Sequence, residues 1–157
     1  NNNLFSHVDI KKENTHIPNG VARNLEEECN SYENLIKTKG PIDIMFLGIG
    51  PNGHIGFNEP EDYFEPLTHI VKLTEDTITA NSRFFDDMES VPKSAITMGM
   101  KAILSAKKIV LLATGEAKAD AVFKSIKGKV TPQVPASVLQ LHNDVTFILD
   151  KDAAKYL

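Results

Sequence analysis

Cysteine, tryptophan and long apolar runs are scarce or missing from this sequence. With Cys29 as its single cysteine, the chain forms no internal disulfide bond, which suits a reducing compartment. No apolar run approaches the length of a membrane span, and no signal-peptide pattern opens the sequence. Basic residues are not in surplus either, because 17 lysines and arginines stand against 21 aspartates and glutamates. We therefore expect a cytoplasmic protein that binds neither membranes nor nucleic acid.

The residues that are present are typical of a folded domain. The 157 residues are 41% hydrophobic and 24% charged, which is enough for one domain with a sizeable core. The chain opens with three asparagines and no methionine, and apolar residues follow at once. This opening predicts a fragment, so we interpret residues 1–157 as part of a single domain.

The pattern of apolar residues predicts the fold class. Short apolar segments predict buried β-strands at residues 42–47, 108–113 and 145–149, with weaker strand patterns at 68–73 and 95–98. Helical patterns occupy residues 24–40, 74–85, 100–106 and 116–126, and a short helix is expected at the C-terminus. Because strands and helices alternate, we predict an α/β fold with an open, mostly parallel, Rossmann-like sheet flanked by helices.

The segment at residues 48–60 follows the first predicted strand and holds four glycines, two asparagines, one histidine and one glutamate. Glycines at this density let a backbone approach a ligand closely. His54 and Glu59 are the side chains here that transfer protons near neutral pH. A loop histidine is often only hydrogen-bonded to its surroundings, but a carboxylate five residues later favours acid–base chemistry. Since ligands of open α/β sheets bind where strands end, we predict the functional site at this loop.

The glycines of this loop also fit G-x-G-x-x-G, the dinucleotide-binding fingerprint, with Gly48, Gly50 and Gly53. That fingerprint needs its third glycine to open a helix whose N-terminus holds a pyrophosphate. Here Gly56 and Pro60 follow soon after and disfavour a helix at that point. We therefore interpret the match as accidental.

Two cations, Arg83 and Lys118, occur where an anion could bind. Lys118 lies in the first turn of a predicted helix, where the helix dipole favours anions over cations. It is either a solvated surface lysine or a ligand of an anion held at the free helix N–H groups. Arg83 is likewise either a surface arginine beside aromatic residues or an anion ligand. Together the two cations favour a phosphate.

Patterns typical of metal sites are missing from the sequence. No cysteine–histidine cluster suggests zinc, and the acidic residues lack calcium-loop spacing. The remaining histidines considered, His16, His69 and His142, have no acid–base neighbours in the sequence, so we interpret them as structural. We expect no metal site.

Several motifs in register resemble the signature of the glucosamine-6-phosphate deaminases, also called isomerases. They are LGIGPNGHIGFNEP at 47–60, ANSRFF at 80–85, VPK at 91–93, TMG at 97–99 and PASVLQLH at 135–142. The resemblance covers nearly the whole chain and implies the Rossmann-like fold of the ribose-phosphate-isomerase-like superfamily. It also implies an enzyme of amino-sugar catabolism, without metal or organic cofactor. Its reaction combines hydrolysis with aldose–ketose isomerisation, converting glucosamine 6-phosphate and water to fructose 6-phosphate and ammonia.

The resemblance further implies roles for single residues. His54 would open the sugar ring and carry a proton to the ring oxygen, while Glu59 would orient and tune it. Asn52 occurs where many members carry aspartate; as asparagine it positions His54 or substrate but takes no proton. Arg83 and Lys118 match phosphate ligands of the family. The substrate loop would include Gly48, Gly50 and Gly53.

Two departures from the family pattern matter. The family's C1–C2 proton-shuttling carboxylate and its phosphate loop lie in an N-terminal segment that this chain lacks. We therefore expect roughly the C-terminal two-thirds of the enzyme's single α/β domain. Larger members bind an N-acetylated sugar-phosphate activator through basic and serine residues after the Asn-Glu-Pro motif, whereas residues 61–66 here are acidic and aromatic. This difference predicts the small, non-allosteric type.

Alternative functions stay open. The same reaction on galactosamine 6-phosphate is one, and lactone hydrolysis as in 6-phosphogluconolactonases is another. The complete NEP and ANSRFF motifs favour the deaminase over the lactonase. A sugar-phosphate sensor would bind without turnover, although the retained His54 and Glu59 argue against it. In each case the expected partner is a small sugar phosphate. The sequence is also compatible with a homo-oligomer.

Overall fold

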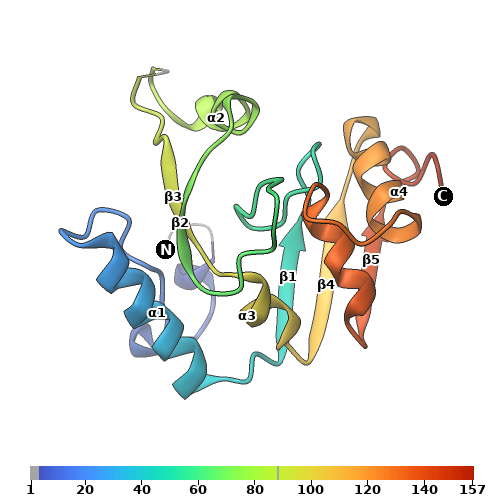
Figure 1. Ribbon diagram of the computed structural model, residues 1–157. Coiled ribbons are helices and arrows are strands. Elements are labelled where there is room, and N and C mark those ends of the chain that lie inside the picture. Colours follow the sequence, from blue (N-terminus) through green and yellow to red (C-terminus); the bar gives the residue numbers. More distant parts are fainter. Residues whose placement is uncertain (1–3, 88) are drawn as a thin grey trace.

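The computed structural model describes residues 4–87 and 89–157 and has an α/β fold (Figure 1). Its central sheet contains three strands in the order β1-β4-β5, with bounds Ile44–Gly48, Lys108–Ala113 and Val145–Leu149. Both strand pairs are parallel, and Phe46 of β1 lies opposite Val110 of β4. The predicted α/β class with a mostly parallel sheet is therefore confirmed.

A second, smaller sheet lies apart from the first (Figure 1). It pairs β2 (His69–Lys72) with β3 (Ser94–Thr97), and the two strands are antiparallel. Both strands were expected from the sequence, but the separate antiparallel sheet was not. The chain between them, residues 73–93, carries the helical segment that faces the loop after β1.

The helices lie where the sequence patterns predict them, except at the C-terminus. The α-helices are α1 (Leu25–Lys39), α2 (Glu75–Asn81), α3 (Met100–Leu104) and α4 (Ala119–Lys127). Short 3₁₀ helices are η1 (Phe5–His7), η2 (Lys12–Asn14), η3 (Ser82–Phe84), η4 (Glu116–Lys118) and η5 (Pro135–Leu141). Asn24 caps α1, since its side chain accepts hydrogen bonds from the N–H groups of Glu26 and Glu27. The predicted C-terminal helix is wrong, because residues 151–156 form turns.

One face of the three-stranded sheet forms the core. Successive side chains of a strand point to opposite faces, so alternate residues share this core. Its buried members include Met45, Ile109 and Leu111 from the sheet and Ile103, Val122 and Leu139 from α3, α4 and η5. In the described chain the other face carries exposed apolar side chains, namely Ile44, Phe46, Leu112 and Ile148. The prediction of buried strands is therefore correct for the core face and wrong for this face, where Phe46 is 69% exposed.

Neighbouring segments hold the glycine-rich loop after β1 in place. The N–H of Ala136 in η5 donates to the carbonyl of Gly53 at 2.9 Å. From the other side, Phe57 N–H donates to Thr97 Oγ1 of β3 at 3.1 Å. The loop is thus held between η5, which packs on the three-stranded sheet, and the small sheet. Within residues 4–87 and 89–157, no helix combines the length and apolar character needed to cross a bilayer.

Candidate active site

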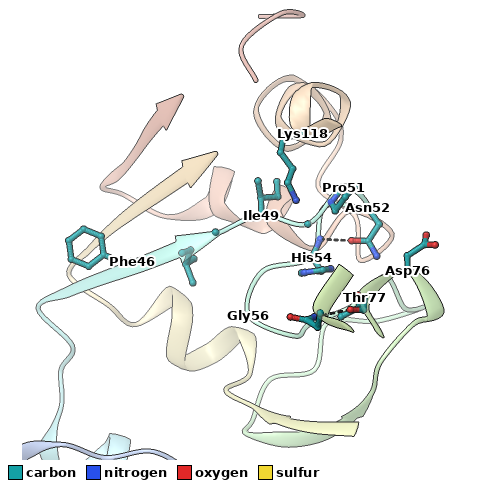
Figure 2. A pocket seen from close by; sticks show the side chains of 13 residues that line it. Phe46, Ile49, Pro51, Asn52, His54, Gly56, Asp76, Thr77 and Lys118 are labelled. Carbon is teal, nitrogen blue, oxygen red and sulfur yellow. Dashed lines mark hydrogen bonds between the residues drawn. The ribbon is translucent and has the colours of Figure 1, made fainter. Parts of the chain in front are cut away.

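A pocket of about 370 Å³ opens at the C-terminal end of β1. Open α/β sheets place their ligands at this edge. Figure 2 shows lining side chains from β1 and the loop after it, from helix α2 and from the start of α4. The polar lining residues are Asn52, His54, Asp76, Thr77, Asn81 and Lys118. Acid–base and cationic groups therefore share one cavity.

Glycines give the loop a shape that other residues would not allow. Gly53 and Gly56 have φ of 87° and 61°, in the left-handed region that favours glycine. Gly50 is required for a different reason, since the His54 ring lies directly against it. A Cβ atom at Gly50 would come within 2.3 Å of His54 Cε1 and 2.4 Å of Nδ1. Gly48 has open space where a Cβ would lie, so sterics alone do not require glycine there.

Asn52, His54 and Glu59 lie in contact with one another. Asn52 Nδ2 donates to Glu59 Oε2 at 2.7 Å, and its Oδ1 accepts from the backbone N–H of His54 at 3.1 Å. Both ends of the amide therefore have partners, which fixes its orientation. Asn52 contacts the backbone of His54 rather than its ring.

The ring of His54 presents one nitrogen to Glu59. Its Nδ1 is buried and lies 3.3 Å from Glu59 Oε2, without the alignment of a hydrogen bond. The interaction is therefore mainly electrostatic in this conformation. Since the His54 side chain lines the pocket and Nδ1 points toward Glu59, Nε2 is the nitrogen available to a bound ligand.

The carboxylate of Glu59 is held as an anion. Its side chain is only 2% exposed, and such burial by itself raises the pKa of a carboxyl group. The contact with His54 and the hydrogen bonds from Thr77 and Asn52 outweigh burial. Together they lower the pKa of Glu59 to about 2. A fixed negative charge therefore lies next to the imidazole, a group that can transfer protons near neutral pH.

Two threonines of α2 complete the surroundings of Glu59, and the sequence did not predict them. Thr77 Oγ1 donates to Glu59 Oε1 at 2.5 Å, and Thr74 Oγ1 lies 3.4 Å from the same oxygen. Thr74 is also the N-cap of α2, as is typical of a threonine before an acidic first turn. The T-x-x-T spacing was the available signal, because it places both hydroxyls on one side of the first helical turn.

Lys118 lies at the N-cap of α4 and points toward the pocket (Figure 2). The turn before it depends on Gly115, whose φ is 86° and whose N–H donates to both carboxylate oxygens of Asp150. Partial burial and, after it, the positive charge of Arg83 lower the pKa of Lys118 below its ordinary value. The two cations are thus near enough to repel, and a bound anion would relieve that repulsion.

Arg83 lies outside the set of residues that line the pocket. Its side chain is exposed on η3, and the guanidinium carbon lies 4.8 Å from the centre of the Phe84 ring. Of the predicted site residues, Asn52, His54, Gly48, Gly50 and Lys118 line the cavity. Glu59 lies behind His54, and Gly53 shapes the turn. In the described part of the chain, no three His, Cys, Asp or Glu side chains form a group that could hold a metal ion.

Comparison with known proteins agrees with this architecture. Residues 1–148 match the family model of glucosamine-6-phosphate isomerases/6-phosphogluconolactonase. A glucosamine-6-phosphate deaminase of Clostridium novyi (strain NT) is 59% identical over 155 residues, which cover 99% of this chain and 64% of that protein. A solved monomeric glucosamine-6-phosphate deaminase is 50% identical with a TM-score of 0.93, covering 98% of this chain and 64% of the other.

A more distant structure is a 6-phosphogluconolactonase from Trypanosoma cruzi, which is 25% identical with a TM-score of 0.58. The match covers 83% of this chain and 51% of that one. This chain thus spans less than two-thirds of the length of each of these three relatives. The family model and the high identity over nearly the whole chain are sufficient for assignment. The chain belongs to the family of glucosamine-6-phosphate isomerases and 6-phosphogluconolactonases.

Proposed function

We propose that the protein is a glucosamine-6-phosphate deaminase. It converts glucosamine 6-phosphate and water to fructose 6-phosphate and ammonia, so that hydrolytic loss of the amino group accompanies an aldose–ketose isomerisation. The observation that carries this proposal is the contact between His54 and the anionic Glu59 in a pocket that also receives Lys118. Relatives with the name of this activity support it at 59% identity.

His54 opens the sugar ring in this proposal. Opening a cyclic hemiacetal removes a proton from the C1 hydroxyl and adds one to the ring oxygen. Nε2 of His54 takes the first proton and delivers one to the ring oxygen, so the imidazole ends the step unchanged. Glu59 stabilises the intermediate imidazolium, because its carboxylate remains ionised 3.3 Å from Nδ1. Asn52 fixes the loop backbone at His54 and keeps Glu59 oriented.

Arg83 and Lys118 bind the substrate phosphate in this proposal. Lys118 faces the pocket, and Arg83 is close enough to lower its pKa. A phosphate between them would accept charge-assisted hydrogen bonds from both, and an arginine can bind two of its oxygens at once. In this proposal the sugar's reacting end lies toward His54. The buried free thiol of Cys29 supports our further proposal that the enzyme works in the reducing cytoplasm.

Parallel assays on the complete gene product test the proposed function. Ammonia and fructose 6-phosphate are measured with glucosamine 6-phosphate, and the same measurement is made with galactosamine 6-phosphate. Lactone hydrolysis is measured separately with 6-phosphogluconolactone. We expect equal amounts of ammonia and fructose 6-phosphate from the gluco substrate. Faster turnover of the galacto epimer, lactone hydrolysis without ammonia, or binding without turnover would each replace the proposal with a named alternative.

A further inference from the structure

Helix α2 lines the active-site pocket with Asp76, Thr77 and Asn81, and its hydrogen bond to the loop after β1 is made to the carboxylate of Glu59. The chain between β2 and β3 leaves the small sheet at Leu73, whose N–H donates to the carbonyl of Lys93 at 3.0 Å. Beyond this base, α2 lies next to the glycine-rich loop (Figure 1). Among the residues that the structure describes, the hydroxyl contacts from α2 and its cap to that loop both reach Glu59 Oε1, from Thr77 Oγ1 at 2.5 Å and from Thr74 Oγ1 at 3.4 Å. The position of α2 over the pocket therefore depends on this carboxylate.

The hydroxyl of Thr77 has a fixed direction. The N–H of Thr77 donates to Thr74 Oγ1 at 3.3 Å, and Thr74 Oγ1 lies 3.0 Å from Thr77 Oγ1, to which it donates. Because a hydroxyl has one proton, Thr77 then donates its own to Glu59 Oε1 at 2.5 Å. Thr77 is 4% exposed, so little of it is open to bulk solvent. The order of donors makes Thr77 the main α2 partner of Glu59.

The same helix determines where Arg83 lies. Asn81 Nδ2 donates to the backbone carbonyl of Thr77 at 2.8 Å, and this contact stabilises the last turn of α2. The 3₁₀ turn η3 follows directly and contains Arg83. A displacement of α2 relative to Glu59 would therefore move Arg83 relative to Lys118 and to a bound phosphate.

We propose that Thr77 is a positioning residue that holds the phosphate cation Arg83 in register with the carboxylate Glu59. This inference rests on the proposed function for its kinetic consequences. In this role Thr77 acts indirectly, through Glu59 on one side and through α2 on the other. A buried threonine that only satisfied its hydroxyl within the helix would have no such link, because its usual acceptor is a backbone carbonyl one turn earlier.

Thr77→Val tests this role, because valine keeps the branched shape and removes the hydroxyl. We expect kcat/KM for glucosamine 6-phosphate to fall by about tenfold to a hundredfold, the range for losing a hydrogen bond to a charged group. Thr77→Ser retains the donor and should stay within about threefold of wild type. Thr79→Val makes the same chemical change at an exposed position of α2 and should leave kcat/KM unchanged. If Thr77→Val does not fold, Thr77→Ala takes its place.

A double-mutant cycle with Arg83→Ala shows whether Thr77 acts through the phosphate cation. In the Arg83→Ala background, Thr77→Val should raise KM by less than about twofold, because coupled residues are not additive. If Thr77→Val raises KM as much in the Arg83→Ala background as it does in wild type, the two residues are not coupled and the proposal is overturned. A loss in Thr77→Ser as large as in Thr77→Val would also overturn the proposal, since the hydroxyl would then have no role.

Hydrogen exchange gives a measure of the same link that does not depend on activity. Amides of residues 78–84 should exchange at least about tenfold faster in Thr77→Val than in wild type or Thr79→Val, with β4 unchanged. Equal exchange in all three proteins would overturn the anchoring role of Thr77. If wild type releases no ammonia while exchange still rises in Thr77→Val, the anchoring stands and the proposed function fails.

Discussion

Replacing Glu59 by glutamine tests how strongly the site stabilises a buried anion. The pKa of this carboxyl is lowered from 4.5 to about 2. A shift of that size corresponds to roughly 3 kcal/mol between the ionised and neutral forms. Because Glu59 lines an open pocket, solvent screens part of this energy, and we take about half, roughly 1.5 kcal/mol. Glutamine has the shape of the protonated acid and cannot supply this contribution.

The pH dependence of the effect has a definite sign. A carboxyl whose folded-state pKa is depressed stabilises the fold above its unfolded pKa, and this contribution is lost as pH falls through the folded value. For Glu59 the window therefore extends from about pH 4.5 down to about pH 2. Wild type should lose this advantage over Glu59→Gln within that window.

Denaturant unfolding at pH 7 and pH 3 measures the difference. We expect Glu59→Gln to be less stable than wild type by roughly 1.5 kcal/mol at pH 7, and by less than about half of that at pH 3. Glu61→Gln is the matched control, because Glu61 is exposed and lies two residues further along. A gap that stays constant between the two pH values, or that is absent at pH 7, would refute the argument that the site holds Glu59 as an anion.

Four further substitutions test other parts of the site. Arg83→Ala or Lys118→Ala should each raise KM for glucosamine 6-phosphate by about tenfold or more, the value of a charge-assisted hydrogen bond, while unphosphorylated glucosamine should respond little to either. Equal losses with both sugars would show that these cations do not bind the phosphate. Gly50→Ala should lower kcat by about a hundredfold, because its Cβ would displace the His54 ring by overlap at 2.3 Å; unchanged kcat would show that the ring position is unimportant. Asn52→Asp places a second carboxylate where an amide now donates to Glu59 at 2.7 Å, so the pKa of the carboxylate pair should rise. The acidic limb of the pH profile of kcat/KM should therefore move up by about one pH unit or more. A pH profile that does not move would contradict this contact.

Local signals in the sequence were sufficient for most of the secondary structure. Strands β4 and β5 have the predicted bounds, because each is a short apolar run that turn residues end. The α1 cap was likewise predictable, since Asn24 needs only the two N–H groups that follow it. Pairing of β2 with β3 was not, because antiparallel contact between segments so far apart in the chain depends on tertiary structure.

The candidate site was predictable in part for the same reason. The glycine-rich loop is recognisable from its composition. Because it directly follows strand β1, its position at the ligand-binding edge of the sheet was also predictable. Thr77 was missed because its partner, Glu59, lies 18 residues earlier and belongs to a different segment. A threonine in the first turn of a helix is typical of capping, so the T-x-x-T spacing did not identify a carboxylate of another segment as the acceptor. The roles of His54 and Glu59 themselves stay predictions until they are measured.

The most direct test of the central claim is the rate of ammonia release from glucosamine 6-phosphate by wild type and by His54→Gln, in the complete gene product. Glutamine retains a polar side chain but cannot exchange a proton near neutral pH. If His54 opens the ring, kcat should fall by about a hundredfold or more, the usual contribution of acid–base catalysis. The loss should be smaller with substrate supplied in its open-chain form. Unchanged turnover of the cyclic sugar would contradict the account and remove His54 from the mechanism.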